Sequence, residues 1–200
     1  MLRISYLILF FISLDCFAGL FIEPYLGYAF KGEGKTTFSN VAEIDHLYTS
    51  VNYGAKLGYG FLTNHLLGID YCAQSHFLDS DQATAKASDK VSRSQLGIFY
   101  GLLFRRFILS FTQFTSATMN GADAANTNNQ VFTDVNDFAK GSGSSIGLGF
   151  RYSTNLNLAL QMRKFDFKEW QNNGVVNANH QSTKLSDILF TISFPFGVTK

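Results

Sequence analysis

The sequence is poor in charged residues. Charged side chains make up 16% of the 200 residues, below the quarter or so that is usual for a soluble domain. The net charge of +1 at pH 7 gives no basic excess, so nothing favours nucleic acid or another polyanion as a partner. The mean hydropathy of +0.04 excludes a helical membrane bundle, but not a membrane barrel, whose strands are only half apolar.

Proline and cysteine are also scarce. The two prolines fit long strands better than a loop-rich secreted scaffold. The two cysteines are Cys16 and Cys72. Because Cys16 falls in a segment that we expect to be removed, Cys72 is the only cysteine of the mature chain. This excludes an intramolecular disulfide and a cysteine metal cluster, and we expect Cys72 to be a small filler of the interior.

The first 18 residues have the organisation of a cleaved signal peptide. Arg3 supplies the positive n-region, Ile4–Leu14 the apolar h-region, and Cys16-Phe17-Ala18 a small-x-small cleavage site. The apolar run is too short for a membrane helix. Asp15 stands where a lipoprotein would need a small residue, so we do not expect Cys16 to be lipidated. We predict cleavage after Ala18 and a mature domain over residues 19–200.

Hydrophobic residues are nevertheless abundant, at 46%, and they alternate with polar ones most clearly in Val51–Phe77. Successive side chains of a strand point to opposite faces, so this pattern predicts a hairpin with one apolar face and one face of glycine, amide and charge. Each arm is long enough to cross about 30 Å of hydrocarbon when tilted. The apolar row is Val51, Tyr53, Ala55, Leu57, Tyr59, Phe61, Leu67, Ile69, Tyr71 and Ala73.

A soluble barrel is the alternative interpretation of such a hairpin. Its apolar row would point inward, and its outer row should be rich in Lys, Glu, Thr and Ser. The second row here is mostly glycine with a few charges, which suits a narrow lumen where small residues let the walls approach and the charges pair. The hairpin therefore favours a membrane barrel.

The same alternation recurs along the chain and predicts eight strands. It slips near Lys164–Phe167, where we expect a bulge or the membrane rim. The expected strands are Leu20–Lys31, Val51–Phe61, Leu67–Ala73, Arg93–Arg105, Phe107–Thr115, Ser144–Tyr152, Leu156–Phe167 and Leu185–Phe196.

The connections between these strands alternate between long and short. An even-stranded barrel with both termini in the periplasm has this arrangement, whereas a soluble meander has no reason for it. The sequence therefore predicts an all-β fold, a transmembrane up-and-down antiparallel β-barrel of eight strands with short periplasmic turns and four long extracellular loops. The expected loops are Gly32–Tyr48, Leu78–Val91, Ser116–Gly141 and Lys168–Thr183.

The last strand carries a family resemblance. Phe190, Ile192, Phe194 and Phe196 alternate toward a final aromatic, which resembles the C-terminal assembly signal of Gram-negative outer-membrane proteins. Four further residues follow, where that family usually ends on the aromatic. With the signal peptide and the Glu23–Tyr28 opening, the mature chain resembles the small eight-stranded outer-membrane barrels, namely the OmpA-like transmembrane domain and the OmpW-like proteins.

This resemblance implies a location in the outer membrane. It also implies contact with outer-membrane lipid and lipopolysaccharide, and recognition of the last strand by the barrel-assembly machinery. Members of these families include anchors, adhesins, small-molecule pores and lipid enzymes, so the fold does not fix the function. Aromatic residues near strand ends are expected in the interface girdles: Tyr28, Phe30, Phe61, Phe77, Tyr152, Phe194 and Phe196.

The row expected to face the lumen contains eight charged residues. Buried charges must be paired or hydrated, and we expect Lys56 with Asp70, and Arg163 with Asp187, at similar heights on neighbouring strands. Two interpretations stay open: a network that plugs a rigid barrel, or a narrow, gated path that mildly prefers anions. The candidates for lumen ion pairs are Glu23, Lys56, Asp70, Arg93, Arg105, Arg151, Arg163 and Asp187.

The sequence offers two candidate kinds of active site. His180-Gln181-Ser182 resembles the His-x-Ser pair of outer-membrane lipid A deacylases, for which Glu169 or Asp187 would be the nearest acid. The flanking family motif is absent. His46, His65 and His76 have no spacing that suggests a metal site, and no cofactor is expected.

The sequence therefore favours a non-enzymatic outer-membrane barrel with a structural or recognition role through its outer loops, whose extracellular ligand the sequence does not identify. A narrow channel or a transporter of small hydrophobic compounds is the alternative. A lipid A-modifying esterase that uses His180 and Ser182 ranks third.

Overall fold

The computed structural model describes residues 19–39, 43–62, 64–82, 85–121 and 137–197. The signal peptide expected over residues 1–18 lies outside them. Eight long strands and two short ones make up the described fold: β1 Gly19–Phe38, β2 Ile44–Phe61, β3 His65–Gln82, β4 Ala85–Phe104, β5 Phe107–Gly121, β6 Phe138–Ser153, β7 Leu156–Asn172, β8 Val175–Val176, β9 His180–Ser193 and β10 Phe196–Gly197. Among the described residues, no helix is long and apolar enough to cross a membrane.

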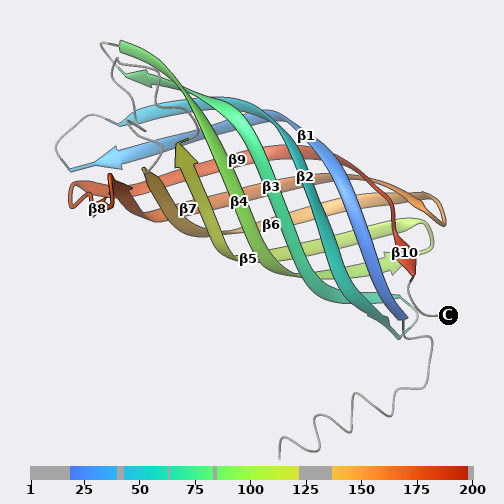
Figure 1. The fold of residues 1–200 in the computed structure, drawn as a ribbon. Helices are drawn as coiled ribbons and strands as arrows, with labels where there is room; N and C mark the ends of the chain where they lie inside the picture. The colour runs from blue at the N-terminus through green and yellow to red at the C-terminus, as the bar shows by residue number, and fades with distance from the viewer. Residues whose placement is uncertain (1–18, 40–42, 63, 83–84, 122–136, 198–200) are drawn as a thin grey trace, which may run out of the picture.

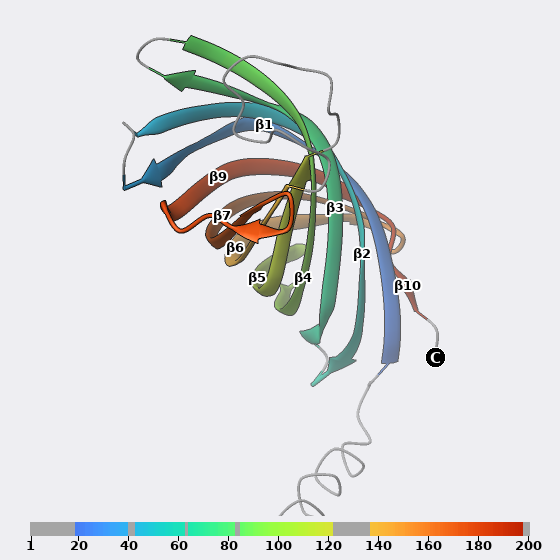
Figure 2. The same ribbon diagram turned by 60° about the vertical axis from the view of Figure 1, so that its left-hand side comes forward.

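The eight long strands close into an antiparallel barrel. Each strand from β1 to β7 pairs with the next one along the chain, and β9 pairs with both β7 and β1. The strands run obliquely around the barrel, and β10 ends beside the start of β1 (Figures 1 and 2). We call this end, which also holds the tight turn between Phe104 and Phe107, the turn end. The expected all-β, eight-stranded up-and-down barrel is confirmed.

The strands are longer than the sequence alternation predicted. The eight strands contain 14 to 20 residues, whereas about 9–11 tilted residues suffice to span a bilayer. Backbone pairing continues well into all four segments expected as loops; β3, for example, ends at Gln82 and β4 begins at Ala85. The expected bounds of those loops are therefore wrong, because ladder hydrogen bonding extends past the region where lipid imposes an apolar outer row.

An apolar band covers the outside of the barrel nearer the turn end. Glycine, amide and charged side chains fill the inside at the same level, so the orientation of the two rows is that of a membrane barrel. The outward residues of the band include Leu26, Tyr28, Phe30, Val51, Tyr53, Leu57, Ile69, Tyr71, Phe77, Leu96, Ile98, Tyr100, Leu109, Phe111, Ile146, Leu148, Leu160, Met162, Phe190, Ile192 and Phe194, all of which are exposed.

Beyond the band, the chemistry of the two faces is inverted. In this distal half the outside carries residues such as Lys35, Asp45, Lys164 and Lys184, which are exposed. The inside is a compact apolar core, as in a soluble barrel. It consists of Ile44, Tyr48, Leu78, Val91, Phe114, Ala117, Met119, Ala139, Phe165, Phe167, Trp170 and Leu185.

This inversion explains why the apolar residues change from one row to the other at Lys164–Phe167. Phe165 and Phe167 point inward and are 3% and 0% exposed, so the strand keeps its period while the inner row changes from polar to apolar. The register between β6 and β7 shifts just after Phe167, because Gly141 pairs with Phe167 but Lys140 pairs with Glu169. The bulge therefore lies at Lys168, not within the expected segment.

Replacing an outward residue of the band by arginine should destabilise the barrel. Ile98 lies in the part of β4 that carries the apolar band, and its side chain is 55% exposed. Ile98→Arg would place a charge near the bilayer midplane, so we expect the free energy of unfolding to fall by about 2–4 kcal/mol. Urea titration of the refolded protein in lipid vesicles measures this loss. The same change at Gly197, beyond the band, should be tolerated; equal tolerance at both positions would contradict a lipid-facing band.

Candidate functional site

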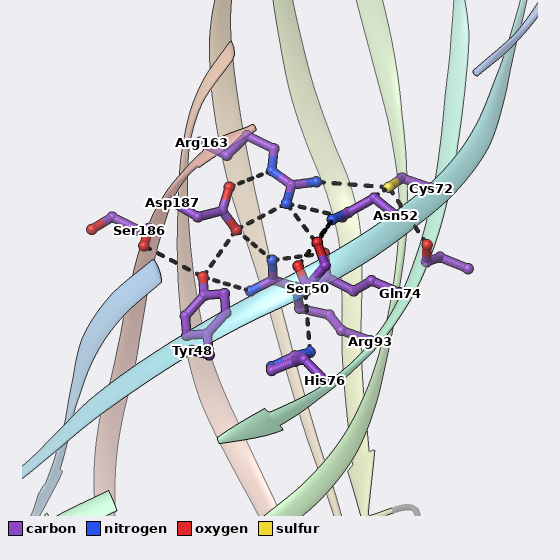
Figure 3. A network of polar contacts seen from close by, with 11 residues as sticks. Tyr48, Ser50, Asn52, Cys72, Gln74, His76, Arg93, Arg163, Ser186 and Asp187 are labelled. Carbon is purple, nitrogen blue, oxygen red and sulfur yellow. Dashed lines mark hydrogen bonds and ion pairs between the residues drawn. The ribbon is translucent and has the colours of Figure 1, made fainter. Parts of the chain in front are cut away.

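The centre of the barrel interior holds an ionic network around Asp187. Arg163 donates from Nε to Asp187 Oδ1 at 2.6 Å and from Nη2 to Oδ2 at 2.9 Å. Arg93 donates from Nη2 to Oδ2 at 2.8 Å, and the Tyr48 hydroxyl donates to the same oxygen at 2.9 Å. The side chains of Arg93 and Asp187 are 0% exposed and that of Arg163 is 1% exposed. One buried carboxylate thus serves two buried guanidinium groups (Figure 3).

This network crosses the lumen from one wall to the other. Arg163 on β7 and Asp187 on β9 are direct neighbours in the ladder. From there the Arg163 guanidinium reaches Asn52 on β2 at 3.0 Å and Gln74 on β3 at 3.2 Å, and it contacts the Cys72 sulfur at 3.7 Å. Arg93 enters from β4. Side chains of five strands therefore meet in one network inside the barrel (Figure 3).

The lumen between this network and the turn end is also filled. Glu23 accepts hydrogen bonds from Asn157 Nδ2 at 2.8 Å and Ser193 Oγ at 2.5 Å. The Phe21 and Phe99 rings meet edge to face, with centroids 5.8 Å apart. A cavity lined by Glu23, Phe99 and Asn157, among others, has a volume of about 20 Å³, which is room for a single water molecule.

The expected ion pair between Lys56 and Asp70 is not formed. The two residues are opposite each other in the β2–β3 ladder, but Asp70 accepts a hydrogen bond from the Tyr25 hydroxyl at 2.9 Å. The Lys56 ammonium lies 5.6 Å from the centroid of the Tyr25 ring and 5.7 Å from that of Phe99. Two inward aromatic rings thus provide a cation–π site that competes with the carboxylate.

Above the network, the apolar core of the distal half closes the interior a second time. Phe165 links the two layers, since its ring lies 4.4 Å from the Arg93 guanidinium and 5.4 Å from the Phe114 ring. Sequence analysis did not place any of these three residues together. The signal available is the pair of inward apolar residues Phe165 and Phe167 on β7, in the segment where the sequence predicts a bulge or the membrane rim.

The remaining candidate residues lie at the turn end or on the outer face. Arg105 lies in the exposed turn between β4 and β5, so its assignment to the lumen is wrong; its guanidinium lies 5.9 Å from the Phe104 ring. Arg151 is half-buried at the end of β6, and no ion pair involves it among the described residues. The C-terminal residues Phe190, Ile192, Phe194 and Phe196 all face outward on β9 and β10.

His180 and Ser182 do not form a catalytic pair. A register shift between Thr37 and Phe38, at the pairing of β1 with β9, turns the two side chains to different faces. His180 Nε2 lies 3.0 Å from Thr183 Oγ1, and its ring packs on Phe38 and Trp170. The candidate acids are engaged elsewhere: Glu169 accepts a hydrogen bond from Gln171, and Asp187 binds the two arginines.

A buried chain of hydrogen bonds links His46 to the neighbouring strands. His46 Nδ1 lies 2.9 Å from Ser80 Oγ, and Nε2 lies 2.7 Å from Thr36 Oγ1, which in turn lies 2.8 Å from Thr183 Oγ1. Burial lowers the pKa of His46 from 6.5 to about 4, because an apolar surrounding disfavours the imidazolium. Among the described residues, no group of His, Cys, Asp and Glu is arranged to hold a metal ion.

The lowered pKa of His46 predicts a loss of stability in acid. Between pH 6.5 and 4 the unfolded chain binds a proton at this residue and the folded chain does not, so the free energy of unfolding falls as the pH falls through this window, by about 3 kcal/mol. Urea midpoints measured from pH 7 to pH 4 test this. His46→Gln should remove this part of the slope, whereas the same change at His65, at the turn end, should retain it.

Residues of the distal half line a polar groove of about 1640 Å³. It is lined by residues of all eight long strands, among them Lys35, Asp79, Ser142, Lys164 and Lys184. Lys35 pairs with Glu43 at 2.8 Å and Asp45 at 3.4 Å, and its hydrogen bond to Glu43 raises the pKa of the amino group. The groove thus presents both signs of charge on a surface outside the apolar band.

Comparison with solved structures identifies the fold. Neisserial surface protein A (NspA) superposes with a TM-score of 0.52 at 12% identity over 90% of this chain and 100% of that chain. OprG from Pseudomonas aeruginosa gives 0.49 at 12% identity over 89% and 96%. Ail, the attachment invasion locus protein of Yersinia pestis, gives 0.48 at 9% identity over 89% and 99%. No protein-family model matches the sequence, and no curated protein matches it. The chain has the fold of the small eight-stranded outer-membrane β-barrels.

Proposed function

We propose that the protein is a closed, non-enzymatic outer-membrane barrel that displays its distal half as a recognition surface outside the cell. The filled lumen carries this proposal. The Arg93–Asp187–Arg163 network occupies the barrel at one level, and the apolar core occupies it above. A continuous column of water would have to displace both layers. Arg93 and Arg163, two of the candidates for lumen ion pairs, are thus part of a plug.

The distal half supports the recognition role. Its strands continue past the apolar band, and outward polar residues such as Lys35 and Lys184 line the groove of about 1640 Å³. A purely structural anchor would not need strands of 14 to 20 residues, because about 9–11 residues suffice to cross a bilayer. A rigid barrel that projects from the membrane instead holds a binding surface in a fixed orientation, which reduces the entropy lost when a ligand binds.

Planar-bilayer recording tests the closed lumen. The purified, refolded protein should show no steady conductance at neutral pH. A steady current would contradict the plug and favour the narrow channel, and the preference of that current for anions or cations would then report the charge of the path. A refolded porin inserted under the same conditions serves as the positive control.

Surface display has its own test. Cys72 is 0% exposed, so a new surface cysteine is the only one that should react with a membrane-impermeant maleimide. Lys184→Cys in the groove should be labelled on intact cells. Thr154→Cys in the turn between β6 and β7 should be labelled only after the outer membrane is opened. The reverse pattern would invert the proposed orientation.

A further inference from the structure

Three arginines gather at the turn end without a counter-charge. Arg105 and Arg106 form the tight turn between β4 and β5, because Phe104 pairs directly with Phe107. Arg151 lies beside them at the end of β6, where its backbone N–H donates to the Arg106 carbonyl at 2.6 Å. Among the described residues, none of the three forms an ion pair, and no exposed carboxylate lies at this end.

Two features of this cluster are unfavourable for folding alone. Arg105 has a φ of 54°, in the left-handed region where a hairpin turn favours glycine or asparagine. Arg106 and Arg151 extend the β5–β6 ladder beyond the pair Phe107 and Phe150, so two like charges stand opposite each other, which destabilises a sheet. An external anion that binds these side chains would offset the repulsion.

The surroundings identify the anion. Phe104, Phe107 and Tyr152 are exposed beside the arginines, at 68%, 52% and 67%. Exposed aromatic rings at the end of an apolar band mark the membrane–water interface. The nearest carboxylate, Glu23, is buried and already bound to Asn157 and Ser193. A guanidinium group at this depth meets the phosphate of a lipid headgroup, which it can bind through two parallel hydrogen bonds.

We propose that Arg105, Arg106 and Arg151 form a binding site for the phosphate headgroup of an anionic phospholipid in the leaflet at the turn end. The aromatic side chains beside them would contact the upper part of the acyl chains. The site would fix the depth of the barrel in that leaflet. It rests on the membrane location proposed above.

Native mass spectrometry of the full mature protein in a neutral detergent tests the site. Phosphatidylglycerol and phosphatidylcholine with the same acyl chains are titrated separately. The wild-type protein should bind phosphatidylglycerol more tightly, and Arg106→Gln with Arg151→Gln should weaken that binding by about fivefold for each arginine, with phosphatidylcholine unchanged. Lys35→Gln with Lys184→Gln makes the same charge change in the distal half and should leave phosphatidylglycerol binding unaltered.

A second variant separates binding from folding. Arg105→Gly removes one guanidinium and supplies the residue that the left-handed φ favours. It should weaken phosphatidylglycerol binding about fivefold, while its urea midpoint in phosphatidylcholine vesicles equals or exceeds that of the wild type. Unchanged lipid binding in both arginine variants would overturn the proposal. So would displacement of the lipid by inorganic phosphate at equal concentration, because the site would then take a free anion.

The lipid titration is independent of the proposed function. It reports binding at the turn end whether or not the barrel conducts. Labelling of Thr154→Cys on intact cells would contradict the orientation proposed for the barrel, but the measured preference for phosphatidylglycerol would still stand or fall with the three arginines.

Discussion

Asp187→Asn should lower the free energy of unfolding by about 3–5 kcal/mol, the usual cost when one partner of a buried ion pair is removed. The carboxylate is 0% exposed and accepts hydrogen bonds from Arg163, Arg93 and Tyr48. An amide keeps the shape but removes the only negative charge between two guanidinium groups. Urea unfolding in lipid vesicles measures the loss.

A matched variant and a double-mutant cycle make this result specific. Asp45→Asn removes a carboxylate of the distal outer surface, 65% exposed and 3.4 Å from Lys35; we expect a change within about 1 kcal/mol. Arg163→Gln should be strongly non-additive with Asp187→Asn, because the first change removes one of the cations that the second leaves unpaired. If Asp187→Asn costs no more than Asp45→Asn, water reaches the network and the plug is refuted.

The part of this network that sequence could predict is the part that is local. Arg163 and Asp187 lie on consecutive long strands. Both fall in the inner row and at similar distances from the connecting loop, so the sequence predicts that they are neighbours. Arg93 reaches Asp187 from β4 across the barrel. That contact depends on closure and on the stagger of the strands, which no pattern within one strand or one hairpin contains.

The outer row was predictable for a similar reason, and only as far as lipid imposes it. Leu57, Ile98 and Met162 alternate with polar residues because one side meets hydrocarbon. In the distal half the period of two continues through Lys164, Phe165 and Phe167 while the apolar row moves inside. The alternation shows which residues share a face; whether that face points to lipid or to a core depends on depth, which the sequence does not mark.

The predicted ion pair between Lys56 and Asp70 is wrong because aromatic side chains of other strands compete for both residues. Lys56 and Asp70 are ladder neighbours, as the hairpin predicts. Their side chains nevertheless turn to different partners, because the Tyr25 hydroxyl reaches Asp70 from β1 and the Phe99 ring reaches Lys56 from β4. Alternation places Tyr25 in the inner row of its own strand, but which residues of other strands its side chain meets depends on how the barrel closes.

The inverted distal half predicts a large effect of Phe167→Ala. The Phe167 side chain is 0% exposed within the apolar core, and its ring lies 6.3 Å from that of Phe165. Truncation removes buried apolar surface and leaves a cavity that a closed barrel cannot collapse, so we expect the free energy of unfolding to fall by about 3–5 kcal/mol. Urea titration in vesicles measures this loss.

The lipid dependence of that loss distinguishes a core outside the membrane from a lipid-facing position. Because Phe167 packs only on protein, Phe167→Ala should cost the same in vesicles of short and of long acyl chains. Lys168→Ala, at the adjacent exposed bulge of β7, should change the stability by no more than about 0.5 kcal/mol. A cost for Phe167→Ala that varies with bilayer thickness would place this residue in the band, and the projecting half with its polar groove would then have to be assigned to the membrane instead.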